Sequence, residues 1–529
     1  MTSLAAAFLV IFPQLDLPGT QPGELGFNLR TPSNCSTCHG GYADYAAYDS
    51  WAGSMMANAA RDPIYLAALT VANQDIPGSG ELCIKCHSPR GWLAGRGIPT
   101  DQSALVENDY ESVECDFCHR MTPGPGDERF IGNGHFYVAD DYISRGSLND
   151  AAATHQVEYS EYISESEFCG ACHDVSNPLQ NDFAVERTYS EWKNSAFADE
   201  NQSCQSCHMV VVDNAYNTNN ANTPLRSVPR HDLVGGNVWV PLMMAGMYPG
   251  LGREQAFQYT SDRARELLQE SAALTVEVDN GRGVNELGMP ILSAGKNNRI
   301  AVRVENLTGH KLPTGYPEGR RAWLEVKLID SQGVALYSSG GYDLDTATRS
   351  EDPDLHTYEA KLASGGVEGF HFVTTDEVLQ DNRIPPRGFR PTPATQPVGR
   401  EYQALEDGSL AHWDDVVYNI DIPDAALLGS GTLIVNLWYQ TTSREYIEFL
   451  RDENVTDNRG QELYDLWLQY DRAPPVAMAS VTLDIELTEA PACGCQVQQP
   501  GAGPWPMTGP AMLGLLGLLA IRLRRRRQV

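Results

Sequence analysis

Basic residues are scarce in this chain of 529 residues. It holds 38 Lys and Arg against 69 Asp and Glu, for a net charge of -31. A protein that binds nucleic acid needs a basic surface to displace the counterions of the phosphates, so we expect no nucleic acid partner. Long hydrophobic runs are also missing. The apolar runs at residues 4–12 and 507–521 are both shorter than the roughly 20 residues that a membrane-spanning helix needs.

Cysteine is confined to a few places in the chain. Ten of the 12 cysteines belong to five copies of the pattern Cys-x-x-Cys-His, and the other two are Cys493 and Cys495. A disulfide framework does not require a His after every pair. A thioredoxin-like motif occurs once within a βαβ pattern, which this sequence lacks, and a zinc ribbon does not need the trailing His. The His after every pair and the lack of a βαβ pattern therefore favour haem attachment over a disulfide framework, a thioredoxin-like motif or a zinc ribbon.

The pattern Cys-x-x-Cys-His is the attachment motif of c-type haem. Its two thiols form thioethers to one porphyrin, and the adjacent His becomes the proximal ligand of the iron. The sequence therefore predicts five covalently bound haems c. The attaching cysteines are Cys35, Cys38, Cys83, Cys86, Cys115, Cys118, Cys169, Cys172, Cys204 and Cys207, and the proximal ligands are His39, His87, His119, His173 and His208.

The five motifs are crowded into 174 residues, from Cys35 to His208. About 35 residues per haem are too few to build a conventional core around each large apolar macrocycle. The haems must then form much of the core themselves, with their edges packed close together. Such packing of redox centres is the geometry of an electron conduit.

Each haem iron has a sixth coordination position, and its occupant separates an electron carrier from a catalyst. Residues 48–57 read Tyr-x-x-Trp-x-x-Ser-Met-Met-Ala, and residues 189–198 repeat this pattern with Phe197 in the place of Met56. Both copies have helical spacing. Either Met56 is a ligand through its thioether, or both residues belong to an apolar core. Further candidates, each weighed against an ordinary core or surface role, are His135, His155 and His231.

Residues 285–490 change periodicity. Alternating apolar and polar residues at 300–305, 324–328 and 481–487, between turns rich in Gly and Pro, predict an antiparallel β-sandwich. An amphipathic helix over residues 253–274 would connect it to the first domain.

His310 lies within a loop of this second part, between Gly309 and Lys311. Two interpretations stay open. His310 is a turn residue satisfied by backbone groups, or it reaches across to bind a haem of the first domain. In the second case Arg320 and Arg321 would neutralise haem propionates. Three other histidines of the region are interpreted as structural: His356, His371 and His412.

Residues 31–250 resemble the multihaem cytochromes c of the superfamily that includes the tetrahaem cytochrome, hydroxylamine oxidoreductase and pentahaem nitrite reductase. In that group a W-x-x-S-x-H element supplies a distal His. Here Trp51 and Ser54 match, but Met56 stands in the His position, which implies a His/Met haem or an open site. The nitrite reductases commonly carry C-x-x-C-K at the active haem, whereas all five motifs here end in His. Segments 306–315, 381–386 and 437–443 resemble the C-terminal β-domain of some multihaem cytochromes.

Both ends of the chain carry targeting features. Residues 4–12 fit the apolar core of a signal peptide, although no Lys or Arg precedes them. The tail joins Cys493-Gly-Cys495, the apolar run 507–521 and an Arg cluster at 522–527, and it resembles the C-terminal sorting tails of myxobacterial type. In such a tail the cysteines are a modification site. A membrane anchor is the alternative, but fifteen residues span roughly 22 Å as a helix, short of the bilayer core of about 30 Å.

The expected organisation thus has five parts. They are a signal peptide (1–22), a mainly α and irregular, haem-packed cytochrome domain (31–250), a helical connector (251–284), an antiparallel β-sandwich domain (285–490) and a sorting tail (491–529). Haem attachment in bacteria takes place outside the cytoplasm, so we expect export to the periplasm or the outer surface.

The expected function is electron transfer through five haems. Two alternatives remain open: a redox enzyme of the nitrite reductase or hydroxylamine oxidoreductase type with one open haem, and a binding module whose β-domain docks a partner or substrate. Residues 31–250 hold 28 acidic and 11 basic residues, and residues 101–200 alone hold 21 and 5. This excess of negative charge favours, as partners, other redox proteins with a basic docking face.

Overall fold

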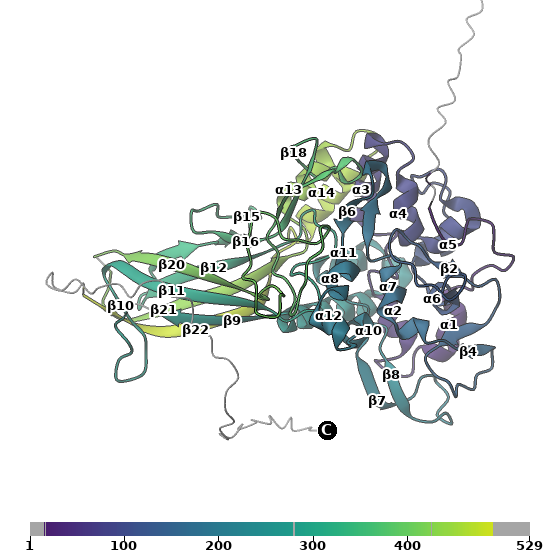
Figure 1. Cartoon of the computed structure of the whole chain (residues 1–529), viewed down its shortest axis with the longest axis horizontal. Coiled ribbons are helices and arrows are strands. Elements are labelled where there is room, and N and C mark those ends of the chain that lie inside the picture. The colour runs from purple at the N-terminus through teal and green to yellow at the C-terminus, as the bar shows by residue number, and fades with distance from the viewer. Residues whose placement is uncertain (1–14, 16, 279–280, 425, 490–529) are drawn as a thin grey trace, which may run out of the picture. The chain divides into compact units, whose positions relative to one another are not determined.

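Residues 15, 17–278, 281–424 and 426–489 are described by the computed structural model (Figure 1). The predicted signal-peptide core at 4–12 and the predicted sorting tail, with Cys493 and Cys495, lie outside these residues. Within the described ranges, no helix is both long enough and apolar enough to cross a membrane.

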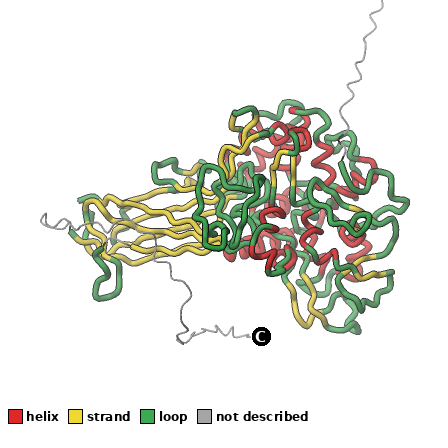
Figure 2. The backbone as a smooth tube through the Cα atoms, in the orientation of Figure 1, coloured by secondary structure: helices red, strands yellow, loops and turns green. Residues whose placement is uncertain are grey.

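The N-terminal part consists of short helices joined by long loops (Figure 2). Asp62 caps the longest of these helices by accepting the N–H of Ile64 at 2.9 Å, and Pro63 occupies the first helical position. The helices are α1 (Pro32–His39), α2 (Ala47–Ala52), α3 (Pro63–Asp75), α4 (Gly80–His87), α5 (Pro89–Gly91), α6 (Cys115–Arg120), α7 (Ser166–Gly170), α8 (Thr188–Lys193), α9 (Ala196–Asp199), α10 (Cys204–His208) and α11 (Trp239–Met247).

Pairs of short strands and single helical turns fill the loops of this part. The strand pairs are β1 (Met121–Thr122) with β2 (Tyr137–Val138), β3 (Ser144–Gly146) with β4 (Val157–Tyr159), β5 (Val175–Asn177) with β6 (Phe183–Glu186), and β7 (Val211–Ala215) with β8 (Arg226–Pro229). The single turns are η1 (Trp92–Arg96), η2 (Glu107–Glu111), η3 (Tyr162–Ser164), η4 (Pro178–Gln180) and η5 (Pro249–Leu251).

A long amphipathic helix, α12 (Glu254–Glu270), leads into the second part. Its buried face includes Phe257, Ala264 and Leu268. The predicted connector helix ran to residue 274, but the chain turns at Ser271 and enters strand β9 (Ala272–Val278), which pairs with the sheet that follows. The last residues of the expected connector therefore belong to a sheet.

Two larger sheets form the second part. One has the order β10 (Ile291–Ser293), β22 (Val476–Thr488), β21 (Gly429–Gln440), β12 (Arg321–Asp330) and β13 (Ala335–Ser339), with β16 (His356–Tyr358) pairing β12. The other has the order β20 (Trp413–Ile422), β11 (Gly295–Asn306), β9. Buried side chains alternate along β12 and β20, and residues of both sheets share one apolar cluster that includes Val302, Val326 and Val435. The pairing of β10 with β22 is parallel, unlike the expected antiparallel arrangement.

The second part also contains smaller strands and a single turn. Two of its helices pack against the first part. The smaller elements are β14 (Tyr342–Asp343), β15 (Thr348–Arg349), β17 (Ala360–Ser364), β18 (Val367–Glu368), η6 (Phe372–Thr374) and β19 (Glu377–Asp381). Between β21 and β22 lie α13 (Arg444–Asp452) and α14 (Arg459–Gln469), which the alternating pattern did not predict. Ile447 and Trp467 from these helices share an apolar cluster with Ile64 of α3 and Met243 of α11.

The contact between α2 and α12 generates the first prediction. A Cβ atom at Gly53, which follows α2, would lie 2.0 Å from the carbonyl oxygen of Ala256. We expect Gly53→Ala to force the two helices apart and lower the free energy of unfolding by about 1–3 kcal/mol. Gly250→Ala is the control, because no atom lies within 4 Å of its Cβ position. Urea unfolding followed by tryptophan fluorescence measures both, and equal stability of the two variants would contradict the prediction.

Candidate haem centres

Four of the five Cys-x-x-Cys-His motifs lie inside helices. They occupy the C-terminal residues of α1 and α4 and the whole or most of α6 and α10. Helical residues three apart share a face, so both thiols of a motif point the same way, and the His follows directly. The fourth motif differs. Helix α7 ends at Gly170, so Cys172 and His173 lie beyond its end.

Three contacts join cysteines of different motifs. Cys35 hydrogen-bonds with Cys115, Cys86 with Cys172, and Cys169 with Cys204. Cys118 also lies close enough to Cys169 and Cys172 to raise the pKa of both thiols. The contacts connect motif 1 to motif 3, and motif 4 to motifs 2 and 5. Motif 3 lies near motif 4, so the motifs do not follow one another in space as they do in sequence.

The Nδ1 atoms of four motif histidines meet backbone carbonyl oxygens. The acceptors are Asn217 for His39, Ala59 for His87, Arg145 for His119 and Val234 for His208, at 2.9, 3.2, 2.6 and 2.6 Å. A carbonyl oxygen only accepts, so Nδ1 must carry the proton and the lone pair must be on Nε2. Such an outer hydrogen bond is the usual support of a metal-binding imidazole.

Three motif histidines face another His at nearly the same distance. The ring centroids of His39 and His155 are 6.5 Å apart, those of His119 and His231 are 6.3 Å apart, and those of His208 and His310 are 6.4 Å apart. When two imidazoles bind one metal ion, each nitrogen is about 2 Å from it and each ring centre about 1 Å further out, so the centroids are about 6 Å apart. The three pairs therefore fit an iron between them.

The facing histidines also have the protonation state that ligation needs. Nδ1 of His155 and Nδ1 of His310 both meet backbone carbonyl oxygens, at 3.1 Å in each case. Burial lowers the pKa of His231 and of His310 to about 4. These two imidazoles are neutral at pH 7, as a metal ligand must be.

His87 and His173 face no other His among the described residues. His87 stacks on the ring of Tyr65 at 3.8 Å, and burial lowers its pKa to about 4. The predicted ligand His135 instead stacks on Phe130 at 4.1 Å. Met56 is held through its backbone, whose carbonyl accepts the N–H of Val113. The ligand role of His135 and of Met56 stays a prediction.

Nδ1 of His173 has a different neighbour from the other four. The carboxylate of Glu186, at the end of β6, lies 3.7 Å from it. Burial on its own would lower the pKa of His173, but the Glu186 carboxylate more than offsets this, and the pKa is raised. The side chain of His173 is 51% exposed.

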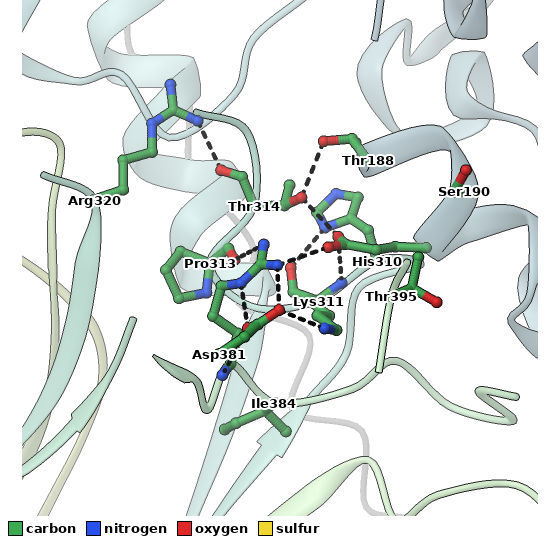
Figure 3. Close-up of polar contacts among 12 residues, drawn as sticks. Thr188, Ser190, His310, Lys311, Pro313, Thr314, Arg320, Asp381, Ile384 and Thr395 are labelled. Carbon is green, nitrogen blue, oxygen red and sulfur yellow. Dashed lines mark hydrogen bonds and ion pairs between the residues drawn. The ribbon is translucent and has the colours of Figure 1, made fainter. Parts of the chain in front are cut away.

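A buried polar network attaches the loop of His310 to helix α8 of the first part (Figure 3). The N–H of Lys311 donates to Glu191 of α8 at 3.1 Å, and the Thr314 hydroxyl donates to the same carboxylate at 2.8 Å. The Lys311 ammonium, fully buried, lies 2.6 Å from Asp381. Burial would raise the pKa of Asp381, but the charges of Arg383 and Lys311 lower it to about 2. The loop is thus fixed in place by charges from both parts of the chain.

The two copies of the sequence repeat make equivalent contacts. Trp51 Nε1 donates to the carbonyl of Val113, and Trp192 Nε1 donates to that of Gln202; each acceptor is two residues before the first Cys of a motif. The residue before each Trp holds the segment of a facing His. Ser50 Oγ accepts the N–H of His231, and Glu191 accepts that of Lys311. Each copy therefore braces a motif and its facing His together.

The remaining predicted residues have other partners among the described residues. His356 pairs with Asp414 at 2.8 Å, His371 with Asp75 at 2.8 Å, and His412 with Glu305 at 3.1 Å. Arg321 bonds to Gln440 within the sheet. The guanidinium of Arg320 donates to the carbonyl of Thr314.

Two comparisons with known proteins agree with this geometry. Residues 34–120 match the family model described as cytochrome c554 and c-prime. The crystal structure of a penta-heme cytochrome c552 from Thermochromatium tepidum is similar to this chain, with 17% sequence identity and a TM-score of 0.53, and the match covers 86% of this chain and 99% of the other. No curated protein matches the chain. The chain thus has the fold of a multihaem cytochrome c.

The buried network gives the second prediction. Asp381→Asn leaves the ammonium of Lys311 buried without its carboxylate. Breaking a buried pair in this way costs about 3–5 kcal/mol, which we expect as a lower free energy of unfolding in urea. Glu200→Gln removes a carboxylate that pairs with Arg387 at the surface and should change little, because exposed ion pairs contribute little. Similar losses in both variants would disprove a special role for the buried pair.

Proposed function

We propose that this chain is an exported c-type cytochrome that binds five haems covalently and carries electrons. The three His–His pairs at 6.3–6.5 Å are the observation that carries the proposal. The fold similarity and the five attachment motifs support it. Haem supplies a one-electron Fe(III)/Fe(II) couple. The residues of this chain attach it, ligate it and exclude water from it.

In this proposal the thioethers form at the ten motif cysteines, and the five motif histidines are proximal ligands. His155, His231 and His310 are the distal ligands of haems 1, 3 and 5, numbered by motif. This ligand set explains why Met56 and Phe197 can stand where the W-x-x-S-x-H element has its His. The two repeat copies bring in His231 and His310 from distant segments, so Met56 and Phe197 are not needed at haems 3 and 5. Met56 and His135 remain candidates for haems 2 and 4.

The thiol contacts support an order for the electron path. Thiols in contact belong to haems whose edges are close, so haem 1 neighbours haem 3, and haem 4 neighbours haems 2 and 5. Cys118 links haem 3 to haem 4. The path therefore runs 1–3–4 and divides at haem 4 toward haems 2 and 5.

A redox enzyme is the second candidate function. The observation that favours it is that His87 and His173 face no His among the described residues, so one of these two haems would keep an open distal side. The enzyme would be of the nitrite reductase or hydroxylamine oxidoreductase type, as the sequence resemblance implies. A binding role of the β-domain is a third candidate, which rests on the sequence resemblance alone.

The partner and the location follow from charge and chemistry. The excess of acidic residues over basic ones at 101–200, 21 against 5, would attract a redox protein with a basic docking face. Export to the periplasm or the cell surface is part of the proposal, because it is there that haem is attached.

The proposal predicts the spin states of the haems. Purified protein should contain five haems per chain by pyridine haemochrome assay, and ferric EPR should show low-spin signals from at least three of them. Fewer than three low-spin haems would overturn the ligand assignment. Cyanide and nitrite decide between the two functions, because an open haem binds them with a change in spectrum. Five low-spin haems that bind neither anion would eliminate the enzyme candidate.

The β-domain is predicted to complete haem 5. His310→Ala should keep all five haems attached but convert one low-spin ferric haem to high-spin. His412→Ala is the matched control, a His of the same domain that pairs with Glu305 instead of facing a motif His. An unchanged EPR spectrum in His310→Ala would remove His310 from the ligand set, whereas a change in both variants would indicate a general structural effect.

A further inference from the structure

The group that lies beside Nδ1 of the motif His differs at one motif of the five. At four motifs the partner is a neutral backbone carbonyl. At motif 4 it is the carboxylate of Glu186, 3.7 Å from Nδ1 of His173. That distance exceeds an ordinary hydrogen bond but leaves a negative charge directly behind the imidazole. Motif 4 is also the one whose helix is assigned to end before its second Cys.

The Glu186 carboxylate is partly shielded from water. Its side chain is 19% exposed, and the positive charge of Arg320 acts on it. The Arg320 guanidinium is itself held by the Thr314 carbonyl and lies over the ring of Tyr316, 4.3 Å from its centroid. The Glu186 carboxylate thus lies beside His173, largely screened from solvent.

A carboxylate in this position acts on the redox couple through the ligand. It makes the imidazole a stronger electron donor, and its charge favours the more positive iron. Reduction of Fe(III) to Fe(II) adds one electron and breaks no bond, so the effect is a pure shift of the equilibrium toward Fe(III). A backbone carbonyl, which carries no net charge, has a much smaller influence.

We propose that Glu186 is a positioning residue for His173 that gives haem 4 the lowest reduction potential of the five. This inference rests on the proposed function, because it requires a haem at motif 4. Haem 4 is also the branch point of the thiol contacts. Electrons that enter at haem 1 or haem 3 therefore pass through haem 4, which stays mostly oxidised, and reduce haems 2 and 5, whose potentials are higher.

The test is a spectroelectrochemical titration of the full-length holoprotein. Glu186→Gln keeps the shape of the side chain and removes its charge. We expect the most negative of the five one-electron midpoints to rise by a tenfold change in its reduction equilibrium constant, which is about 59 mV for one electron. The other four midpoints should move much less. Glu186→Asp restores the charge and should return the midpoint toward that of the unmodified protein.

A second variant separates a specific effect from a general change in charge. Glu167→Gln removes a carboxylate in the same motif helix that bonds to Tyr189 and Lys193, away from His173. It should shift the lowest midpoint by less than Glu186→Gln does. Equal shifts in the two variants, or no shift in Glu186→Gln, would overturn the inference. The haem assay on the unmodified protein tests the proposed function separately, because a chain that lacks haem would fail before any titration.

Discussion

The distance between facing imidazoles is the constraint on which the rest of the structure depends. Three pairs of rings keep centroid separations of 6.3–6.5 Å, although their members come from segments that are 102 to 116 residues apart in the sequence. A closer approach would exclude a metal ion, and a wider one would leave it without its sixth ligand. Backbone contacts maintain the spacing. The N–H of His231 bonds to Ser50, and the N–H of Lys311, next to His310, bonds to Glu191. Each of these acceptors lies on a helix that also contacts an attachment motif.

Buried charged residues attach the second part of the chain to the first part. Lys311 and Asp381 come from the loop and strand that surround His310, and Glu191 comes from α8. A buried charge without its partner is costly, so the network has few alternative arrangements and the loop cannot slide. The proposed function gives this close packing of the β-domain a purpose, because His310 would then be a ligand of the haem at motif 5, where Phe197 stands in the repeat position.

The local features could be predicted from the sequence, whereas the pairing of distant ones could not. The five motifs, the helical repeat at 48–57 and 189–198, and the strands at 300–305, 324–328 and 481–487 all follow from local spacing. The structure confirms the three strands, and it has helix over the first residues of each repeat copy, Ala47–Ala52 and Thr188–Lys193. The first repeat copy precedes motif 2 in sequence but braces motif 3, because Trp51 reaches Val113. Helices α13 and α14 were missed because they interrupt an alternating pattern. Glu186 gave no signal at all, since nothing in the spacing between it and His173 marks a contact.

The groups beside Nδ1 of the motif histidines show what the five sites share and where they differ. Four donate Nδ1–H to carbonyl groups that the fold places there for its own hydrogen bonding, so their imidazoles are tuned alike. At motif 4 a carboxylate from strand β6 lies beside Nδ1 in place of a carbonyl. Cys172 and Cys169 of the same motif also lie next to thiols of two other motifs. Under the proposed function, the haem whose histidine faces a charged group would therefore also be the haem with the most neighbours.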